Sequence, residues 1–141
     1  MRDWEGVGRP VKRVIYVVED DEAVRDSFRA LLESYGMSVE DFASAEDFLR
    51  RSTERSTAAV QGCLLLDIHM PGMSGLELLE TLHAANSVLP VIVITGRSNR
   101  RLRDRLIRAG VCAVLDKPID GNVLLSAIES AVGSSSEAPQ L

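Results

Sequence analysis

Reactive polar side chains stand directly after apolar runs at several separate points of the sequence. In chain order they are Glu19, Asp20, Asp67, Thr95 and Lys117. Three carboxylates brought together repel one another and raise one another's pKa, so such a cluster persists when a divalent cation neutralises it. A few carboxylates, a carbonyl and water molecules suit Mg²⁺, which usually completes its coordination with phosphate oxygens. These residues therefore predict a magnesium site.

A hydroxyl and an ammonium group at the same place would add what a phosphoryl group needs. Thr95 would supply a hydrogen-bond donor and Lys117 a positive charge. The remaining carboxylate can then act as a nucleophile and form an aspartyl phosphate. Polar residues also end strands for purely structural reasons, but here four separate strand ends carry compatible groups.

Five short apolar runs alternate with five segments of helical periodicity, and these elements must position the polar residues. The runs cover residues 14–18, 38–42, 63–66, 90–95 and 111–115, and the helical segments cover about 24–35, 44–49, 75–85, 99–109 and 122–132. Such alternation predicts an α/β fold with a parallel sheet covered by helices on both faces. Ligands of these sheets bind beyond the carboxyl ends of the strands, which is where the polar residues stand.

Length and composition bound the class of protein. The 141 residues carry a formal net charge of −5 and are 45% hydrophobic, which is typical of one globular domain. We expect an N-terminal extension at residues 1–11, a single domain at 12–132 and a flexible polar tail at 133–141, with a polar connection at 52–61. No apolar run is long enough to span a bilayer, and the first residues lack the apolar core of a secretory signal.

The two cysteines say less about function than the polar residues do. Cys63 and Cys112 both lie among aliphatic residues, and their spacing supports neither a disulfide nor a metal site. We expect two buried free thiols in a reducing cytoplasm. The net acidity of the chain also weighs against general binding of nucleic acid.

The sequence resembles the receiver domain of two-component response regulators over residues 12–132. The resemblance rests on VVEDDEAVR, LLLDIHMPGMSGLELL, PVIVITG and LDKPI, in that order, and the segment from Asp67 to Gly75 is its most specific part. It implies a flavodoxin-like sheet of order 2-1-3-4-5 with five flanking helices. The segments SAEDFL and MSGLELL look like the FixJ-like branch, whose members carry a C-terminal LuxR-type DNA-binding domain; we expect no such domain in this sequence.

The resemblance also implies roles in metal binding. Asp67 is the phosphoacceptor, and Glu19 and Asp20 are the acidic pair. Asp20, Asp67 and the backbone carbonyl of His69 would bind Mg²⁺. By the same alignment Asp21 flanks the pair, and we expect it to cap the first helix.

Further roles follow from the resemblance at the last two strands. Thr95 is the switch hydroxyl, and Lys117 pairs with the phosphate. The Lys117–Pro118 bond is expected to be cis, which only proline makes inexpensive. The family usually has Tyr or Phe where this sequence has Val114, so either the signal passes through loops and the fourth helix or the output surface is unusual. His69 and Arg97 are either solvent-facing loop residues or modulators of the water that hydrolyses the phosphoryl group.

Residues 97–108 form a strongly basic segment. They hold six arginines and one aspartate. We expect Arg100, Asp104 and Arg108 to form an ion-pair ladder on the fourth helix. The remaining charge is either a solvated helix face or a surface for an acidic partner or for acidic residues across a dimer, since the fourth helix, fifth strand and fifth helix form the signalling face of receivers. Nucleic acid is a weaker third option, because the segment has no interleaved aromatic residues.

The predicted function is therefore that of a cytoplasmic signalling phosphoacceptor, not a classical enzyme. A sensor histidine kinase would phosphorylate Asp67 with Mg²⁺ as cofactor, and phosphorylation would switch binding to an effector protein or a second copy through the face just described. Neither nucleic acid nor a membrane is an expected partner. One alternative is the receiver half of a truncated LuxR-type regulator. Another is a Mg²⁺-dependent aspartyl-phosphate phosphatase, but that class needs a second acid where His69 stands.

Overall fold

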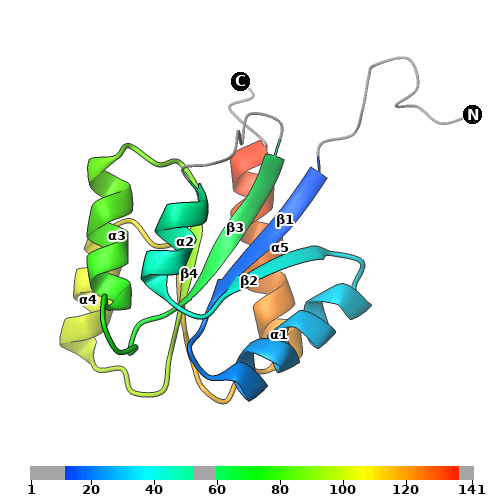
Figure 1. The fold of residues 1–141 in the computed structure, drawn as a ribbon, viewed down its shortest axis with the longest axis horizontal. Coiled ribbons are helices and arrows are strands. Elements are labelled where there is room, and N and C mark those ends of the chain that lie inside the picture. The colour runs from blue at the N-terminus through cyan, green and yellow to red at the C-terminus, as the bar shows by residue number, and fades with distance from the viewer. Residues whose placement is uncertain (1–11, 53–59, 137–141) are drawn as a thin grey trace, which may run out of the picture.

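The five strands form one parallel sheet in the order β2-β1-β3-β4-β5 (Figure 1). This computed structural model describes residues 12–52 and 60–136. The strands are β1 (Lys12–Val18), β2 (Ser38–Phe42), β3 (Val60–Asp67), β4 (Val91–Thr95) and β5 (Ala113–Asp116). The predicted fold class and strand order are both confirmed.

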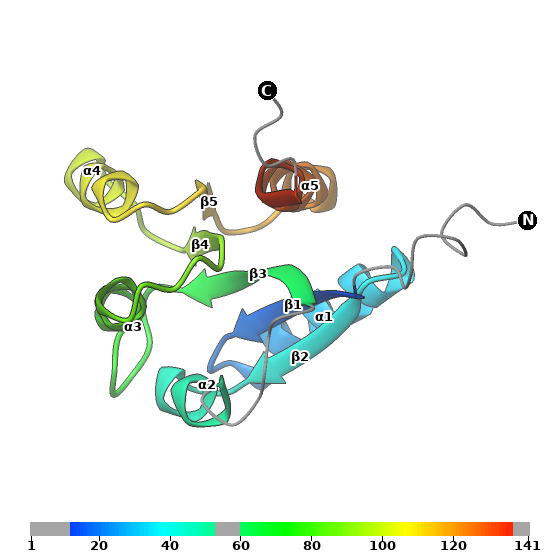
Figure 2. The same ribbon diagram turned by 90° about the horizontal axis from the view of Figure 1, so that it is seen from above.

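Helices cover both faces of the sheet. They are α1 (Glu22–Ser34), α2 (Ala45–Ser52), α3 (Gly75–Ala84), α4 (Arg100–Arg108) and α5 (Gly121–Ser136). Figure 2 shows α2, α3 and α4 on one side of the sheet and α1 and α5 on the other. The inner strands β1, β3 and β4 are thus buried on both sides, which explains why they hold continuous apolar runs, whereas the edge strands β2 and β5 are only partly buried.

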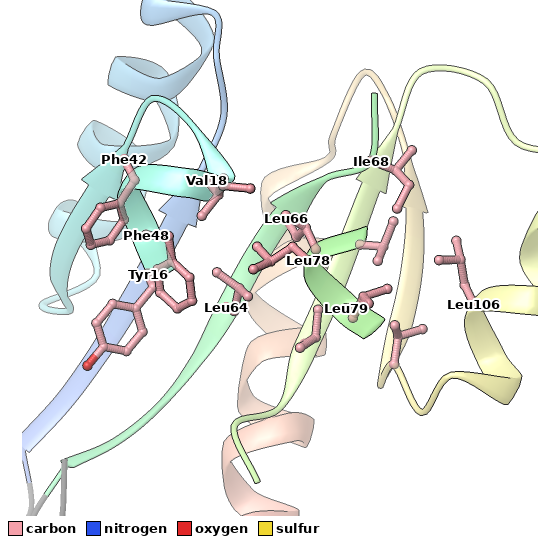
Figure 3. Packing of buried hydrophobic residues seen from close by; sticks show 14 of the residues in the cluster. Tyr16, Val18, Phe42, Phe48, Leu64, Leu66, Ile68, Leu78, Leu79 and Leu106 are labelled. Carbon is pink, nitrogen blue, oxygen red and sulfur yellow. The ribbon is translucent and has the colours of Figure 1, made fainter. Parts of the chain in front are cut away.

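Two apolar clusters lie on the two faces of the sheet. Along β1, Tyr16 points to the side of α2, α3 and α4, whereas Ile15 and Val17 point to the side of α1 and α5. On the first side Tyr16, Phe42 and Phe48 pack together (Figure 3), and the ring centroids of Phe42 and Phe48 are 5.3 Å apart in an edge-to-face arrangement. This packing fixes α2 against the β1–β2 side of the sheet.

Local signals define where the helices begin and end. Asp21 caps α1 as predicted, since its side chain accepts a hydrogen bond from the backbone N–H of Val24 at 3.1 Å. Ser74 forms a capping box with Glu77 at the start of α3. Gly36 follows α1 with a φ of 83°, a conformation that glycine adopts without strain.

Two element boundaries differ from the sequence-based expectations, and two expected segments lie outside the part of the chain that the structure describes. Strand β3 begins at Val60, inside the expected connection 52–61, because Lys12 and Arg13 extend the β1–β3 ladder to Val60 and Gln61. Helix α5 continues through residues 133–136, which we expected to belong to the polar tail. The expected extension 1–11 and residues 137–141 lie outside the described residues.

The two thiols also differ from each other. Cys63 is fully buried within β3, and burial raises its pKa to about 12. Cys112 is exposed, which corrects the expectation of two buried thiols. It directly precedes β5, an edge strand of the sheet that the described residues form. None of the described helices is long and apolar enough to cross a membrane.

Candidate functional site

Three carboxylates meet at the carboxyl end of the two central strands. The β1–β3 register pairs Val18 with Leu66, so the residues that follow them come to the same edge of the sheet. One carboxylate oxygen from each of Glu19, Asp20 and Asp67 lies within 4.8 Å of the other two. These are the residues the sequence predicted, and hard oxygen ligands at this spacing suit Mg²⁺.

The three carboxylates differ in their exposure to solvent. Glu19 is 2% exposed and Asp67 5%, whereas Asp20 lies at the surface. A cation bound here would therefore contact buried oxygens on one side and water or an incoming phosphate on the other. Such a half-open arrangement is what Mg²⁺ sites in phosphoryl transfer require, because Mg²⁺ keeps several water or phosphate ligands.

Lys117 reaches the same cluster from the end of β5. Its Nζ donates a hydrogen bond to Glu19 Oε1 at 3.3 Å and lies 3.7 Å from Asp67 Oδ2. The Lys117–Pro118 peptide bond is cis, as expected. The lysine thus contacts both buried carboxylates, and its positive charge lies beside Asp67, the candidate nucleophile.

The pKa of Glu19 is affected by the charged groups that surround it. Burial raises the pKa of Glu19 above its ordinary value, and the negative charge of Asp67 raises it further. The backbone N–H of Asp21 and the ammonium group of Lys117 lower the pKa of Glu19, but these effects do not cancel the first two. A divalent cation at the cluster would favour the charged form of Glu19.

Asp67 is the last residue of β3, directly before the loop that leads to α3. Its Oδ1 accepts a hydrogen bond from the backbone N–H of His69 at 3.2 Å, while its Oδ2 faces Lys117. The side chain of His69 is exposed, in agreement with its expected place on a loop. The two oxygens of the candidate nucleophile therefore have different partners.

Thr95 ends β4, and its hydroxyl is engaged with its own loop. The side chain is fully buried; Oγ1 donates to the carbonyl of Arg97 at 3.0 Å and accepts from the N–H of Arg97 at 3.1 Å. The side chain of Arg97 is exposed. In this conformation the backbone of Arg97 satisfies the hydroxyl of Thr95.

Val114 occupies the position at which the sequence departs from the receiver pattern. It pairs with Val93 in the sheet and belongs to the apolar cluster that Leu106 of α4 also joins. Val114 is 9% exposed, so it fills core volume beneath α4. A ring is absent here, and an aliphatic side chain packs in its place.

Sequence reasoning missed a polar network around Asp116. Its carboxylate accepts hydrogen bonds from Ser98 Oγ at 2.7 Å and from Arg103 Nη2 at 2.8 Å. By contrast, the expected ladder is wrong: within α4, all of whose residues are described, no ion pair joins Asp104 to Arg100 or Arg108. The sequence held no signal for the Asp116 network, because it depends on how α4 packs beside β5.

Two further contacts at the site were not predicted. Arg25 of α1 donates from Nη1 to the backbone carbonyl of Glu19 at 2.8 Å. Glu46 of α2 accepts at Oε2 from the backbone N–H of Met73 at 3.0 Å. Arg25 stands within the motif VVEDDEAVR and Glu46 within the segment SAEDFL, but neither motif indicates which backbone group the side chain contacts.

Comparisons with known proteins match the chain to one family. Residues 15–129 match the family model described as the response regulator receiver domain. The transcriptional regulatory protein FixJ of Azorhizobium caulinodans is 37% identical over 128 residues, which cover 91% of this chain and 59% of that protein. The response regulator protein TodT of Pseudomonas putida is 39% identical over 119 residues, 84% of this chain and 51% of that protein.

A solved structure shows the same fold. The crystal structure of FixJ-N has a TM-score of 0.77 and 33% sequence identity, and the match covers 87% of this chain and 95% of that one. The chain spans 59% and 51% of the length of the two curated relatives.

Proposed function

Because the chain belongs to the family of response regulator receiver domains of two-component systems, we propose that it accepts a phosphoryl group on Asp67 from a sensor histidine kinase. The observation that carries this proposal is the position of Lys117 Nζ, 3.7 Å from Asp67 Oδ2 and beside the acidic cluster. A buried carboxylate flanked by one ammonium group and two further carboxylates has the parts that an aspartyl phosphate requires.

The transfer is a simple displacement at phosphorus. A carboxylate oxygen of Asp67 forms a bond to the phosphorus of a phosphohistidine, and the bond between that phosphorus and the imidazole nitrogen breaks. The electron pair of that bond stays on the imidazole of the kinase. Lys117 offsets the negative charge on the phosphoryl oxygens throughout. Hydrolysis of the aspartyl phosphate by water later returns Asp67 to its free form.

Receiver domains bind Mg²⁺ at an acidic pocket, and the residues of this chain fit that cation. Asp20, Asp67 and the backbone carbonyl of His69 would hold it, with Glu19 close by. Bound Mg²⁺ would supply positive charge to the phosphoryl oxygens during transfer. The exposed side of Asp20 leaves the phosphoryl donor a route to the site.

The signal would then pass through Thr95 to the α4–β5–α5 face. We propose that the hydroxyl of Thr95 releases the carbonyl of Arg97 and donates to the phosphoryl group, so that phosphorylation shifts an existing equilibrium between two loop conformations. The side chains of Arg97 and Val114 would modulate this step. The partner is an effector protein or a second copy of the chain, and the reaction takes place in the cytoplasm.

Intact-mass measurement after incubation with acetyl phosphate and Mg²⁺ tests the proposal. We expect one phosphoryl group on the wild-type chain and none on Asp67→Asn. Asp26→Asn is the matched control, because Asp26 is an exposed carboxylate of α1 outside the acidic cluster. A phosphoryl group that persists on Asp67→Asn, or that forms equally well without divalent cation, contradicts the assignment.

A further inference from the structure

The loop between β3 and α3, residues 68–74, is tied to helix α2 by one side chain. Glu46 Oε2 accepts a hydrogen bond from the backbone N–H of Met73 at 3.0 Å across 27 positions of the sequence. We propose that Glu46 is a positioning residue for Mg²⁺ binding, since it fixes the loop that carries the carbonyl of His69. The inference rests on the proposed function, because it concerns the cation that phosphorylation of Asp67 requires.

The other hydrogen bonds of this loop are local or lie at its ends. The N–H of His69 bonds to Asp67, and the N–H of Ser74 bonds to Glu77 in the capping box of α3. Ile68 and Gly75 close the base of the loop by backbone hydrogen bonds. Among the described residues, Glu46 is the only one whose side chain bonds to the backbone of the loop from an element other than β3 and α3, which the loop itself connects.

The backbone of the loop is shaped to receive Glu46. Gly72 has a φ of 75°, and a Cβ added to it would lie 3.0 Å from Glu46 Oε2. A side chain at this position would therefore be strained and would also crowd the carboxylate. The close approach of Gly72 lets the N–H of the next residue, Met73, point at Glu46.

The carboxylate of Glu46 starts from a fixed helix end. Ser44 caps α2 through a hydrogen bond from the N–H of Asp47 at 3.0 Å. Ala45 and Phe48 are buried, so the first turn of α2 cannot rotate freely. The carboxylate is charged at neutral pH, and the hydrogen bond from Met73 lowers the pKa of Glu46 below its ordinary value, in keeping with a charged acceptor.

Removal of Glu46 should loosen the loop without unfolding it. The side chains of Met70 and Met73 pack against the apolar cluster on this face of the sheet, and these contacts do not involve Glu46. The loop would keep its place but sample more backbone conformations, so the carbonyl of His69 would be less well oriented for a cation. Loss of one outer partner of this kind weakens metal binding by roughly tenfold or less, because Glu46 is exposed and water competes for its hydrogen bond.

Calorimetric titration with MgCl₂ tests the inference on the whole chain. We compare wild type with Glu46→Ala, which removes the acceptor, and with Glu46→Gln, which keeps an acceptor oxygen but loses the charge. Glu80→Ala is the matched control, because it removes an exposed carboxylate of α3 that makes no hydrogen bond or ion pair with the described residues of the loop. Amide hydrogen exchange at Met73 and urea unfolding report the loop and the global fold separately.

We expect Glu46→Ala to weaken Mg²⁺ binding by roughly threefold to tenfold and to speed exchange at Met73, with an unfolding midpoint close to wild type. Glu46→Gln should restore most of the affinity. Phosphorylation of Glu46→Ala by acetyl phosphate should be slow at limiting Mg²⁺ and approach the wild-type rate at saturating Mg²⁺. This dependence separates positioning of the cation from general damage to the fold.

The alternative outcomes are distinct. Unchanged Mg²⁺ affinity in Glu46→Ala overturns the inference, and so does equal weakening in Glu46→Ala, Glu46→Gln and Glu80→Ala, which would indicate long-range charge alone. If wild type itself binds no Mg²⁺, or if Asp67→Asn accepts a phosphoryl group as wild type does, the proposed function fails instead.

Discussion

Arg103 Nη2 lies 2.8 Å from Asp116 Oδ2, and this ion pair joins helix α4 to the residue that precedes Lys117. Ser98, in the loop before α4, binds the other oxygen of the same carboxylate. The arginine-rich helix is therefore attached to the strand that carries the phosphate-binding lysine. A shift of α4 and a shift of the end of β5 cannot be independent while these contacts persist.

The Asp116 network predicts a pKa change that can be measured directly. The hydrogen bond from Ser98, together with Arg103, lowers the pKa of Asp116. Ser98→Ala and Arg103→Gln should each raise it toward the ordinary value, as measured by NMR titration of the Asp116 carboxyl carbon. Arg108→Gln, on the same helix but outside the network, is the control. A pKa of Asp116 that does not respond to either substitution would show that the contacts do not persist in solution.

The lowered pKa of Asp116 also determines how its contribution to the unfolding free energy changes with pH. Because the pKa of Asp116 is lower in the folded chain, its contribution to stability is present above the unfolded pKa and is lost as the pH falls through the folded pKa. The difference in unfolding free energy between wild type and Arg103→Gln should therefore shrink on acidification. The pair is at the surface, so the difference should also shrink at high salt.

For Glu19 we expect the opposite pH dependence of the unfolding free energy. Its pKa is raised above the ordinary value of 4.5, so the folded chain binds the extra proton at a pH where the unfolded chain has lost it. Without divalent cation, the stability of wild type relative to Glu19→Gln should increase as the pH falls through the raised folded-state pKa of Glu19 toward its ordinary value. Denaturant unfolding at several pH values measures this difference.

Mg²⁺ provides the internal test of that prediction. A bound cation favours the charged form of Glu19, so addition of Mg²⁺ should flatten the pH dependence of wild type and leave that of Glu19→Gln unchanged. Glu80→Gln, at an exposed position on α3, should show no difference from wild type at any of these pH values. A pH dependence that survives saturating Mg²⁺ would argue against cation binding beside Glu19.

Two glycines predict opposite effects of the same substitution. A Cβ at Gly75 would lie 2.7 Å from the carbonyl oxygen of Asp67 and 2.7 Å from the Cα of Ile68, whereas a Cβ at Gly133 would meet nothing within 4 Å. Gly75→Ala should destabilise the chain by about 1–3 kcal/mol, because backbone atoms would have to move. Gly133→Ala should stabilise it by about 0.5–1 kcal/mol, because alanine favours a helix interior.

Urea unfolding of the two variants measures both effects in one experiment. Gly75 opens α3 directly beside the candidate phosphoacceptor, so Gly75→Ala should also slow phosphorylation of the fraction that remains folded. Wild-type stability in Gly75→Ala would show that the loop after Asp67 is looser than its contacts indicate.

The sequence was sufficient to predict what depends on the order of elements. Apolar runs that alternate with helical segments leave few arrangements, and parallel strands bring Glu19, Asp67 and Lys117 to one edge of the sheet. Caps such as Asp21 were predictable because they involve neighbours in the chain. The residues of the acidic cluster were therefore found without a structure.

Contacts between side chains of different elements were not predictable. The pairing of Arg103 with Asp116 depends on the rotation of α4 about its axis, and that rotation is set by the burial of Leu106. A four-residue spacing instead favoured Asp104 as the partner within the helix, which is wrong. The bond from Met73 to Glu46 depends on the path of a loop that has no periodicity. Strand ends were misjudged for a related reason, since β3 extends to Val60 only because β1 is there to pair with it.

The register of the two central strands limits how the length of this sequence can vary. Val18 lies beside Leu66, so Glu19 and Asp67 each follow a fixed number of residues on neighbouring strands. An insertion or deletion of one residue within either strand would turn its side chains to the opposite face or force a bulge. Variants of this sequence should therefore tolerate insertions and deletions at the amino ends of β1 and β3, far from the carboxylates. They should tolerate almost none at the carboxyl ends of these two strands.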